Sequence, residues 1–261
     1  MHFFKVVLFT LLLFSFSQAK EPKLELGIGA GTLYYPNYIG SKTMKTIIAP
    51  LPYLRYRGDY IKIDEDGLTG NLFGIHGLRI DLSMSASLPA DSKKDDAREG
   101  MPDLDLTGEV GFQLVYKFFE DGPYVLEFEL PFRAVISTDF SSLKYRGILS
   151  NPQLKYSMNY SEFEWTLRFG LLFGDEEYNN YYYGVTEEYV TVDRDYYKAD
   201  AGFGGFRSRI GMTYKKGNWW IGSFISYYHI SDAVFAKSPL IETNTNIYTG
   251  ASLAYIFYTA N

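Results

Sequence analysis

The residues of this chain that could do acid–base or nucleophilic chemistry are few. Histidine is the usual general base near neutral pH, and beyond residue 20 the sequence contains only His76 and His229. His229 lies close to Ser231 and Asp232, which together are the residue types of a hydrolytic triad. Neighbouring side chains at the end of a strand point in different directions, whereas a triad is assembled from separate elements. We therefore predict no catalytic site, with an envelope hydrolase that uses His229 as a minor alternative.

Paired carboxylates are a second arrangement that could support acid–base work. Glu127 and Glu129 alternate on one face of a predicted strand, and so do Glu162 and Glu164. Basic residues occupy the equivalent positions of other predicted strands, and charges enclosed by protein must be paired or hydrated. We therefore predict a set of charges that line the interior and interlock, made of Arg79, Glu109, Glu127, Glu129, Arg133, Glu164, Arg168, Arg207 and Arg209.

Metal and cofactor sites are not predicted. The chain has no cysteine, which excludes disulfides and thiolate metal ligands. Asp64-Glu65-Asp66-Gly67 lacks the spacing of the known calcium loop, and the glycines at 27, 29 and 31 precede no helix, so we interpret them as a strand face that another strand or a plug approaches closely. The formal net charge of −6 gives no footprint for nucleic acid.

The elements that must position these charges alternate apolar and polar residues with a period of two. Residues 104–118, 126–136 and 163–173 follow this pattern without a break. Strands of soluble domains run about 5 to 6 residues, whereas a tilted strand that crosses a bilayer needs about 9 to 11. A soluble barrel or sandwich would alternate in the same way. Strand length and the tyrosines, tryptophans and phenylalanines near the strand ends favour the membrane.

The fold class that we predict is all-β, a closed antiparallel transmembrane β-barrel of about twelve strands, with ten as the alternative count. Short turns alternate with longer connections throughout only if the chain breaks at Glu65-Asp66-Gly67. The longer connections are residues 35–45, 89–103, 138–146, 175–200 and 231–245. The strands are residues 24–33, 46–57, 60–64, 68–73, 78–88, 104–118, 124–137, 147–158, 162–174, 201–214, 219–230 and 246–258.

The amino terminus has the features of a secretory signal peptide. Lys5 precedes an apolar run over residues 6–16, and Ser17-Gln18-Ala19 supplies a small-residue cleavage site. We predict cleavage after Ala19, with a retained helical anchor as the alternative. Residues 20–261 then form one barrel domain in the outer membrane of a Gram-negative bacterium, in contact with outer-membrane lipid.

Several short motifs lie along nearly all of the chain after residue 20. They are Gly29-Ala30-Gly31, Tyr35-Pro36-Asn37-Tyr38-Ile39-Gly40-Ser41, Pro50-Leu51-Pro52-Tyr53, Tyr182-Tyr183-Gly184-Val185, Ser238-Pro239-Leu240 and Tyr248-Thr249-Gly250-Ala251-Ser252-Leu253-Ala254-Tyr255. In their order and spacing these motifs resemble the MipA/OmpV family of outer-membrane proteins. The chain departs from the expected pattern in its highly charged 89–103 segment and in its end, where Thr259, Ala260 and Asn261 follow the last aromatic residue. The resemblance implies a non-enzymatic scaffold, since MipA-like members are described as bridging a lytic transglycosylase and a murein synthase. OmpV-like members are described as porins or adhesins, so a small-solute channel or an adhesin is the alternative.

The longest connection carries a cluster of tyrosines with acidic neighbours. Either it is an exposed recognition loop or it folds over the mouth of the barrel. The interior is equally open to two interpretations, because interlocked charges would plug it and segregated charges would leave a narrow pore. The loop residues are Tyr178, Tyr181, Tyr182, Tyr183 and Tyr189.

Overall fold

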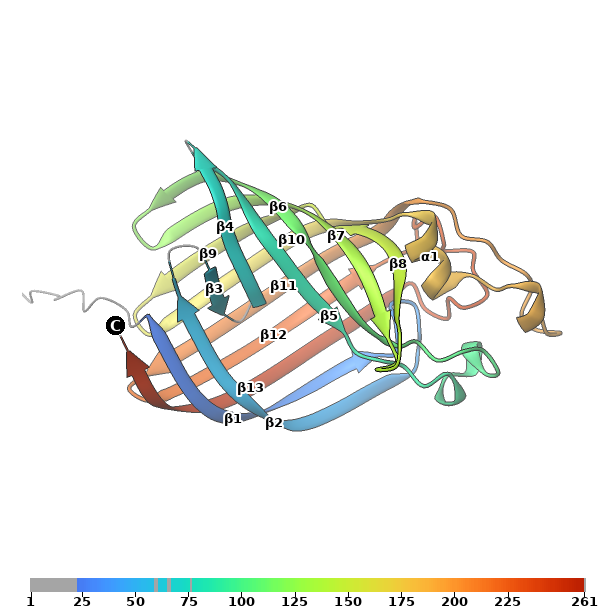
Figure 1. Ribbon diagram of the computed structural model, residues 1–261, viewed down its shortest axis with the longest axis horizontal. Coiled ribbons are helices and arrows are strands. Elements are labelled where there is room, and N and C mark those ends of the chain that lie inside the picture. The colour runs from blue at the N-terminus through green and yellow to red at the C-terminus, as the bar shows by residue number, and fades with distance from the viewer. Residues whose placement is uncertain (1–22, 59–60, 65–66, 76, 261) are drawn as a thin grey trace, which may run out of the picture.

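The alternating segments form the wall of a closed antiparallel β-barrel (Figure 1). The computed structural model describes residues 23–58, 61–64, 67–75 and 77–260, so the predicted signal peptide lies outside the described residues. The strands are β1 Leu24–Pro36, β2 Met44–Arg57, β3 Ile61–Asp64, β4 Gly67–Ile75, β5 Leu78–Ser87, β6 Leu106–Asp121, β7 Tyr124–Thr138, β8 Leu143–Ser150, β9 Gln153–Tyr160, β10 Phe163–Gly174, β11 Gly202–Lys216, β12 Trp219–His229 and β13 Thr245–Ala260. The helices are α1 Glu176–Tyr183 and the 3-10 turns η1 Ser92–Lys94, η2 Asp96–Arg98 and η3 Glu187–Tyr189.

The strands close into a ring of twelve positions, as predicted. β13 pairs with β1, and β10 pairs with β11, so the sheet returns on itself. β8 and β9 both pair with β7 on one side and with β10 on the other, and together they occupy a single position in the wall. The sheet of thirteen strands is therefore a barrel of twelve.

The prediction of one strand over residues 147–158 is wrong. The chain forms two strands there, broken at Asn151 and Pro152, because proline has no N–H to give to the sheet. The side chain of Asn151 instead accepts a hydrogen bond from Nη2 of Arg133 at 2.9 Å. β8 also begins at Leu143, so the connection predicted over 138–146 is a short turn, in which Oδ1 of Asp139 accepts two backbone hydrogen bonds at 2.9 Å.

The predicted break between two short strands near residue 65 is confirmed, since β3 ends at Asp64 and β4 begins at Gly67. Among the residues that the structure describes, β3 meets β2 only at Tyr56↔Ile63 and Arg57↔Lys62. The β3–β4 hairpin therefore completes only part of the wall next to β2 (Figure 1).

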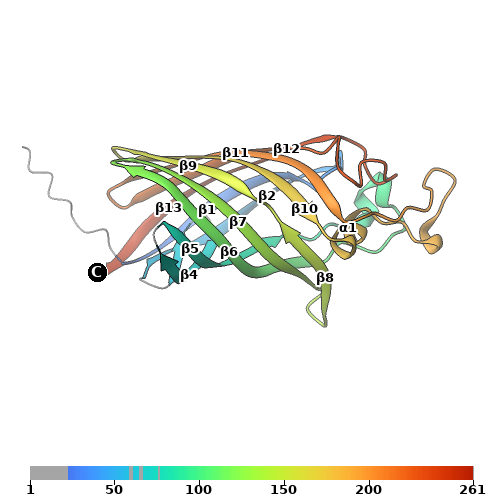
Figure 2. The same cartoon turned by 90° about the horizontal axis from the view of Figure 1, so that it is seen from above.

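The two ends of the barrel differ. Short turns join β6 to β7, β9 to β10 and β11 to β12 at the end where both described termini lie, which we call the turn end (Figure 2). The segments 37–43, 88–105, 175–201 and 230–244 gather at the opposite end, which we call the cap end. No helix within the described ranges is long and apolar enough to cross a membrane.

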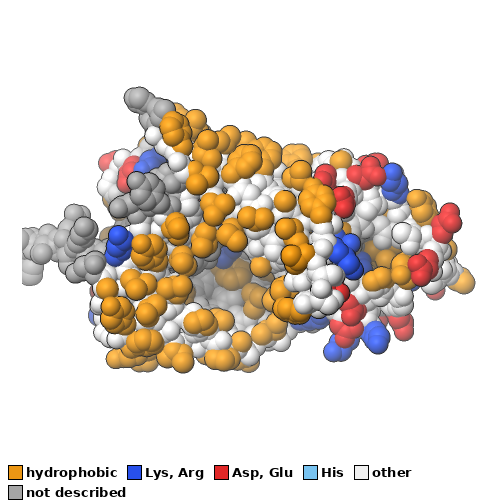
Figure 3. All heavy atoms as spheres, viewed as in Figure 1, with side chains coloured by type: hydrophobic (Ala, Val, Ile, Leu, Met, Phe, Trp, Pro, Cys, Tyr) orange, Lys and Arg blue, Asp and Glu red, His pale blue; other side chains and the backbone are white. Residues whose placement is uncertain are grey.

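The outer face of the wall is apolar and the inner face is polar. Ile48 is 79% exposed and Ile28 63% exposed, and hydrophobic side chains cover the strands in Figure 3, while acidic and basic side chains gather at the cap end. Glu25 and Glu127 are buried inside. A soluble barrel would reverse this arrangement, so the fold is that of an outer-membrane barrel.

The close approach expected at the glycines of β1 is confirmed at Gly29. A Cβ atom there would lie 2.3 Å from the carbonyl oxygen of Leu253 in β13, a distance that no side chain can occupy. The chain therefore needs glycine for β1 to close the barrel against β13.

Candidate functional site

The mouth at the cap end is covered by loops that share a hydrophobic core. Tyr38, Tyr183, Ile230, Phe235 and Leu240 are all buried in it, although they come from three different connections. The rings of Tyr183 and Phe235 stack with their centroids 3.7 Å apart. We call these packed segments the cap, defined as residues 37–43, 88–105, 175–201 and 230–244.

A buried carboxylate in the cap joins its first two segments. Asp95 accepts hydrogen bonds from Nδ2 of Asn37 at 2.8 Å and from Oγ of Ser41 at 2.7 Å. The hydroxyl of Tyr38 lies 3.4 Å from the same carboxylate and donates a shorter bond, of 2.7 Å, to the carbonyl oxygen of Leu240. Because a charged acceptor strengthens each of these bonds, Asp95 fixes the first loop against the second.

Two arginines hold the longest loop to the second one. Nη1 of Arg98 donates to the carbonyl oxygen of Tyr182 at 3.0 Å, and its guanidinium lies 5.7 Å from the ring centre of Tyr38. Burial lowers the pKa of Arg98. Nη1 of Arg194 donates to the carbonyl oxygens of Ala97 and Glu99 at 3.0 and 2.9 Å. All four segments of the cap are therefore linked by hydrogen bonds or by the shared core.

The five tyrosines singled out in the sequence lie in the cap, where α1 folds over the mouth. Tyr183 is buried, and burial raises the pKa of its hydroxyl well above the usual value. Tyr178, Tyr181, Tyr182 and Tyr189 are half-buried. The hydroxyl of Tyr181 accepts a hydrogen bond from the backbone N–H of Asp105 at 2.9 Å. The cluster thus forms part of the cap over the mouth, and its role as a recognition loop stays a prediction.

Charged side chains line the interior of the strands as ion pairs. Arg79 pairs with Glu127 at 2.7 Å, and Arg133 pairs with Glu109 at 2.7 Å. Glu129 accepts from Nε2 of Gln153 at 2.7 Å, and Nζ of Lys155 lies 3.8 Å from it. Glu164 on β10 meets Arg55 on β2 at 3.6 Å, a pair that joins strands from well-separated positions in the wall. The acidic residues therefore interlock with cations along β5 to β10.

The three remaining predicted charges lie together on two neighbouring strands. Arg168 on β10 stands directly opposite Arg209 on β11. The guanidinium of Arg209 lies 4.0 Å from the ring centre of Phe224, and that of Arg207 lies 5.5 Å from the ring centre of Tyr228. These arginines form a basic strip on one side of the interior.

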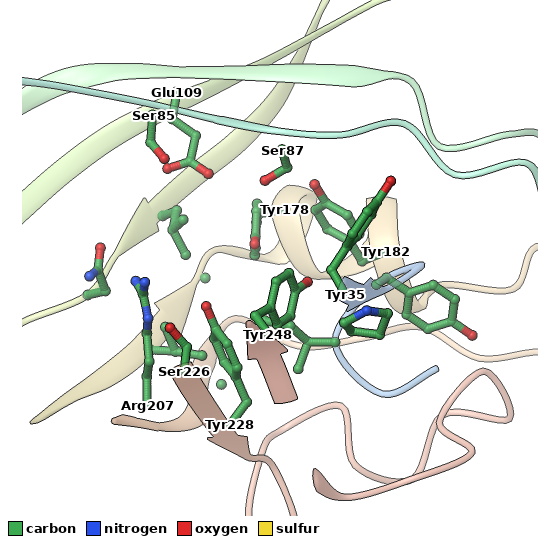
Figure 4. Close-up of a pocket in the computed structure, with 18 of the residues that line it drawn as sticks. Tyr35, Ser85, Ser87, Glu109, Tyr178, Tyr182, Arg207, Ser226, Tyr228 and Tyr248 are labelled. Atoms are coloured by element: carbon green, nitrogen blue, oxygen red, sulfur yellow. The ribbon is translucent and has the colours of Figure 1, made fainter. Parts of the chain in front are cut away.

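A cavity of about 310 Å3 lies directly under the cap (Figure 4). Glu109 points into it from one side and Arg207 from the other, while the tyrosines of the cap and wall form the rest of the surface. The labelled tyrosines are Tyr35, Tyr178, Tyr182, Tyr228 and Tyr248. The cavity thus presents opposite charges and several phenol groups to whatever occupies it.

The side chains of His229, Ser231 and Asp232 differ in one respect from the prediction. Oγ of Ser231 lies 2.7 Å from Nε2 of His229, so the expectation that these side chains point apart is wrong. Asp232 contacts the serine at 3.4 Å. In a triad the carboxylate orients the imidazole instead, and the observed contacts do not make that arrangement.

A match to a family model shows to which protein family the chain belongs. The model described as MltA-interacting protein MipA matches residues 28–257. The chain belongs to the MipA family. Among curated proteins, none matches the chain.

Solved outer-membrane proteins resemble the chain more remotely than the MipA family does. The attachment invasion locus protein Ail of Yersinia pestis aligns with 8% identity over 91% of this chain and 99% of that one, at a TM-score of 0.26. OmpT of Vibrio cholerae aligns with 7% identity over 91% and 100%, at 0.34. The outer-membrane protease OmpT of Escherichia coli aligns with 11% identity over 90% and 95%, at 0.31. The strand pairing alone establishes the barrel fold of this chain.

Three motifs that carry the MipA-family resemblance meet in the cap. The Pro36–Ser41 segment supplies Asn37, Tyr38 and Ser41 to the contacts around Asp95. Oγ of Ser238 donates to the carbonyl oxygen of Tyr183 at 2.7 Å, which joins the last loop to α1. In this chain, residues of these motifs therefore hold the cover over the barrel mouth.

Sequence reasoning missed the central residue of this arrangement. Asp95 lies in the charged 89–103 segment, which stood out only as a departure from the expected pattern. Arg55 and Arg98 were also missed, because one partner of each is far away in the sequence. The sequence held no signal that set Asp95 apart from Asp91 or Asp96, because the burial of Asp95 is visible only in the structure.

Proposed function

We propose that this member of the MipA family is a non-conducting outer-membrane scaffold that holds murein-synthesising and murein-degrading enzymes at the cell envelope. The observation that carries the proposal is the cap, whose buried core and hydrogen bonds to Asp95 cover the mouth of the barrel. The description of the family, MltA-interacting protein, supports a role in holding a partner. We propose likewise that residues 1–19 are removed and that residues 20–261 reach the outer membrane of a Gram-negative bacterium.

The turn end is the surface where we expect the enzymes to bind. Short turns of outer-membrane barrels face the periplasm, where murein lies. Tyr160, the last residue of β9 before the turn to β10, is 74% exposed there. At the cap end, Tyr196 is 56% exposed and provides a matched tyrosine on the opposite face.

Retention on immobilised barrel tests the scaffold. We expect a murein hydrolase and a murein synthase from an envelope extract to be retained by the wild-type barrel, less well by Tyr160→Ser, and normally by Tyr196→Ser. The scaffold proposal fails if neither enzyme class is retained by the wild-type barrel, or if only Tyr196→Ser lowers retention.

Planar-bilayer recordings test the closed interior separately. We expect no conductance steps from the reconstituted protein, because the cap covers the mouth and the Arg55–Glu164 pair reaches across the interior. Regular steps would instead support the small-solute channel. Binding of the cap end to host cells, with no retained murein enzyme, would support the adhesin.

A further inference from the structure

The barrel wall has an opening between β2 and β5. Of the described residues, 44–55 of β2 have β1 as their only strand partner, because the β2–β3 register contains just Tyr56 and Arg57. The β4–β5 register ends at Thr69↔Ser83, so residues 84–87 of β5 have β6 alone. Figure 3 shows a hollow in this face of the molecule, over the region between β2 and β5 in Figure 1.

The free edge of β2 lacks two backbone donors. The N–H of Arg57 donates towards β1, to Lys23, and that of Gly58 donates towards β3, to Ile61. In an antiparallel strand the backbone N–H and C=O groups of successive residues point to opposite neighbours. The β1–β2 register has no shift, so the backbone groups of the even-numbered residues of β2 point to the opening. Two of these are Pro50 and Pro52, which have no N–H. At these two positions the edge therefore has no N–H that would lie unpaired in hydrocarbon.

The opening leads to a second cavity, of about 510 Å3, in the middle of the barrel. Its volume falls within the range of about 300–1,000 Å3 that is typical of ligand sites. The side formed by β1 and β2 is apolar and includes Leu33, Ile47, Ala49 and Leu51. Ile47 and Leu51 are 38% and 45% exposed, so this apolar lining is not filled by other side chains.

The opposite side of the same cavity is basic. Arg168 and Arg209 line it from β10 and β11, where they stand directly opposite each other. Glu164 also lines the cavity, but its carboxylate is engaged by Arg55 at 3.6 Å. Guanidinium groups bind carboxylates and phosphates through paired hydrogen bonds, which makes this side complementary to an acidic head group.

We propose that the mid-barrel cavity binds a single-chain anionic amphiphile, which enters sideways from the bilayer between β2 and β5. Its acyl chain lies through the opening against Ala49 and Leu51, and its acidic head group lies on Arg168 and Arg209. A strand from a partner protein fits the opening less well, because Pro50 and Pro52 have no N–H to donate to it. This activity is separate from the scaffold role and does not depend on it.

Photolabelling of the full-length barrel in phospholipid vesicles tests the proposal. The probe is palmitic acid with a diazirine in its chain, and the matched probe is the corresponding hexadecanol. We expect the acid to label residues of the cavity, and the alcohol to label them at least about tenfold less, since hydrogen bonds to charged groups contribute about 1.5–3 kcal/mol. Equal labelling by acid and alcohol, or labelling confined to the outer surface, overturns the proposal.

Two sets of variants sharpen the result. Ala49→Trp should fill the apolar side and abolish cavity labelling, whereas Ile48→Trp, on the bilayer face of the same strand, should leave it unchanged. Arg168→Gln with Arg209→Gln should remove the preference for the acid. Heat-modifiable migration on gels identifies variants that fold. If Ala49→Trp does not fold, the comparison of the two probes on wild-type protein decides alone. Undiminished cavity labelling of a folded Ala49→Trp barrel contradicts entry through this opening.

Discussion

Substitution of Asp95 by alanine tests whether the cap is held by its buried carboxylate. The change removes two short hydrogen bonds, from Asn37 at 2.8 Å and from Ser41 at 2.7 Å, and leaves both donors buried without that acceptor. Hydrogen bonds to a charged group contribute about 1.5–3 kcal/mol each, so the first loop should lose about 3–6 kcal/mol of local stability. At 1.4 kcal/mol for each factor of ten, its opening becomes at least about 100-fold more frequent.

Amide hydrogen exchange in detergent measures this opening directly. The N–H of Asn37 donates to Thr43 at 3.0 Å and that of Ser41 to Tyr38 at 3.1 Å, so both amides should exchange at least about 100-fold faster in Asp95→Ala. Amides of β6 and β7 should keep their protection. Asp96→Ala, an exposed carboxylate of the same loop, removes the same charge and should change nothing. Unchanged exchange at Asn37 and Ser41 in Asp95→Ala would refute the reasoning.

Three further perturbations follow from the same geometry. Arg133→Met leaves Glu109 buried without its 2.7 Å partner, so the free energy of unfolding in urea should fall by about 3–5 kcal/mol. The added change Glu109→Gln should restore most of this loss. An unaltered urea midpoint for Arg133→Met contradicts the interlocked interior. Gly29→Val places side-chain atoms against the carbonyl oxygen of Leu253, so the heat-modifiable band should disappear, and a normally folded Gly29→Val barrel would show that β1 can close otherwise. Hydrogen bonds from Ser141 and Ser142 lower the pKa of Asp139, so its contribution to the β7–β8 turn is present above the unfolded pKa of about 3.9 and is lost as the pH falls through the lower folded value. Protection of the Ser142 amide, measured against an unstructured amide at the same pH, should fall at low pH in wild type and depend little on acid pH in Asp139→Asn, and a flat wild-type protection profile would disprove this.

The strands were predictable because the alternation of apolar and polar residues depends only on which side chains face lipid and which face the interior. A wall one residue thick must show alternate side chains to lipid and to the interior, so 104–118 and 163–173 reveal β6 and β10 without any tertiary knowledge. The split of β8 from β9 was not predicted, although Pro152 was a signal for it in the sequence, since proline has no N–H for the sheet. The contact between Asn151 and Arg133, which the sequence does not reveal, shows where the freed side chain binds. Pattern therefore predicts the wall but not its interruptions.

The cap was much less predictable than the wall. Its segments have no period, and the contacts that fix them join residues distant in the sequence, such as Tyr38 and the carbonyl of Leu240. The 89–103 segment stood out in the sequence only by its high charge, whereas the structure shows that Asp95 and Arg98 are buried by partners from other connections. Three of the family motifs lie in the cap, but only the structure shows which contacts their residues make.

The long-range contacts of the cap also impose an order on how the protein is made. Gly40 donates to Asn246 at 2.6 Å and Tyr38 to Leu240, so the first loop receives its final partners from the last part of the chain. The same part brings β13 to β1, which seals the cylinder. Contacts between sequence-distant segments form late because their loop-closure entropy is lost before they become favourable. The cover of the barrel can therefore be completed only once insertion of the last hairpin is under way, and a stalled assembly intermediate would have an uncovered mouth that envelope proteases could recognise.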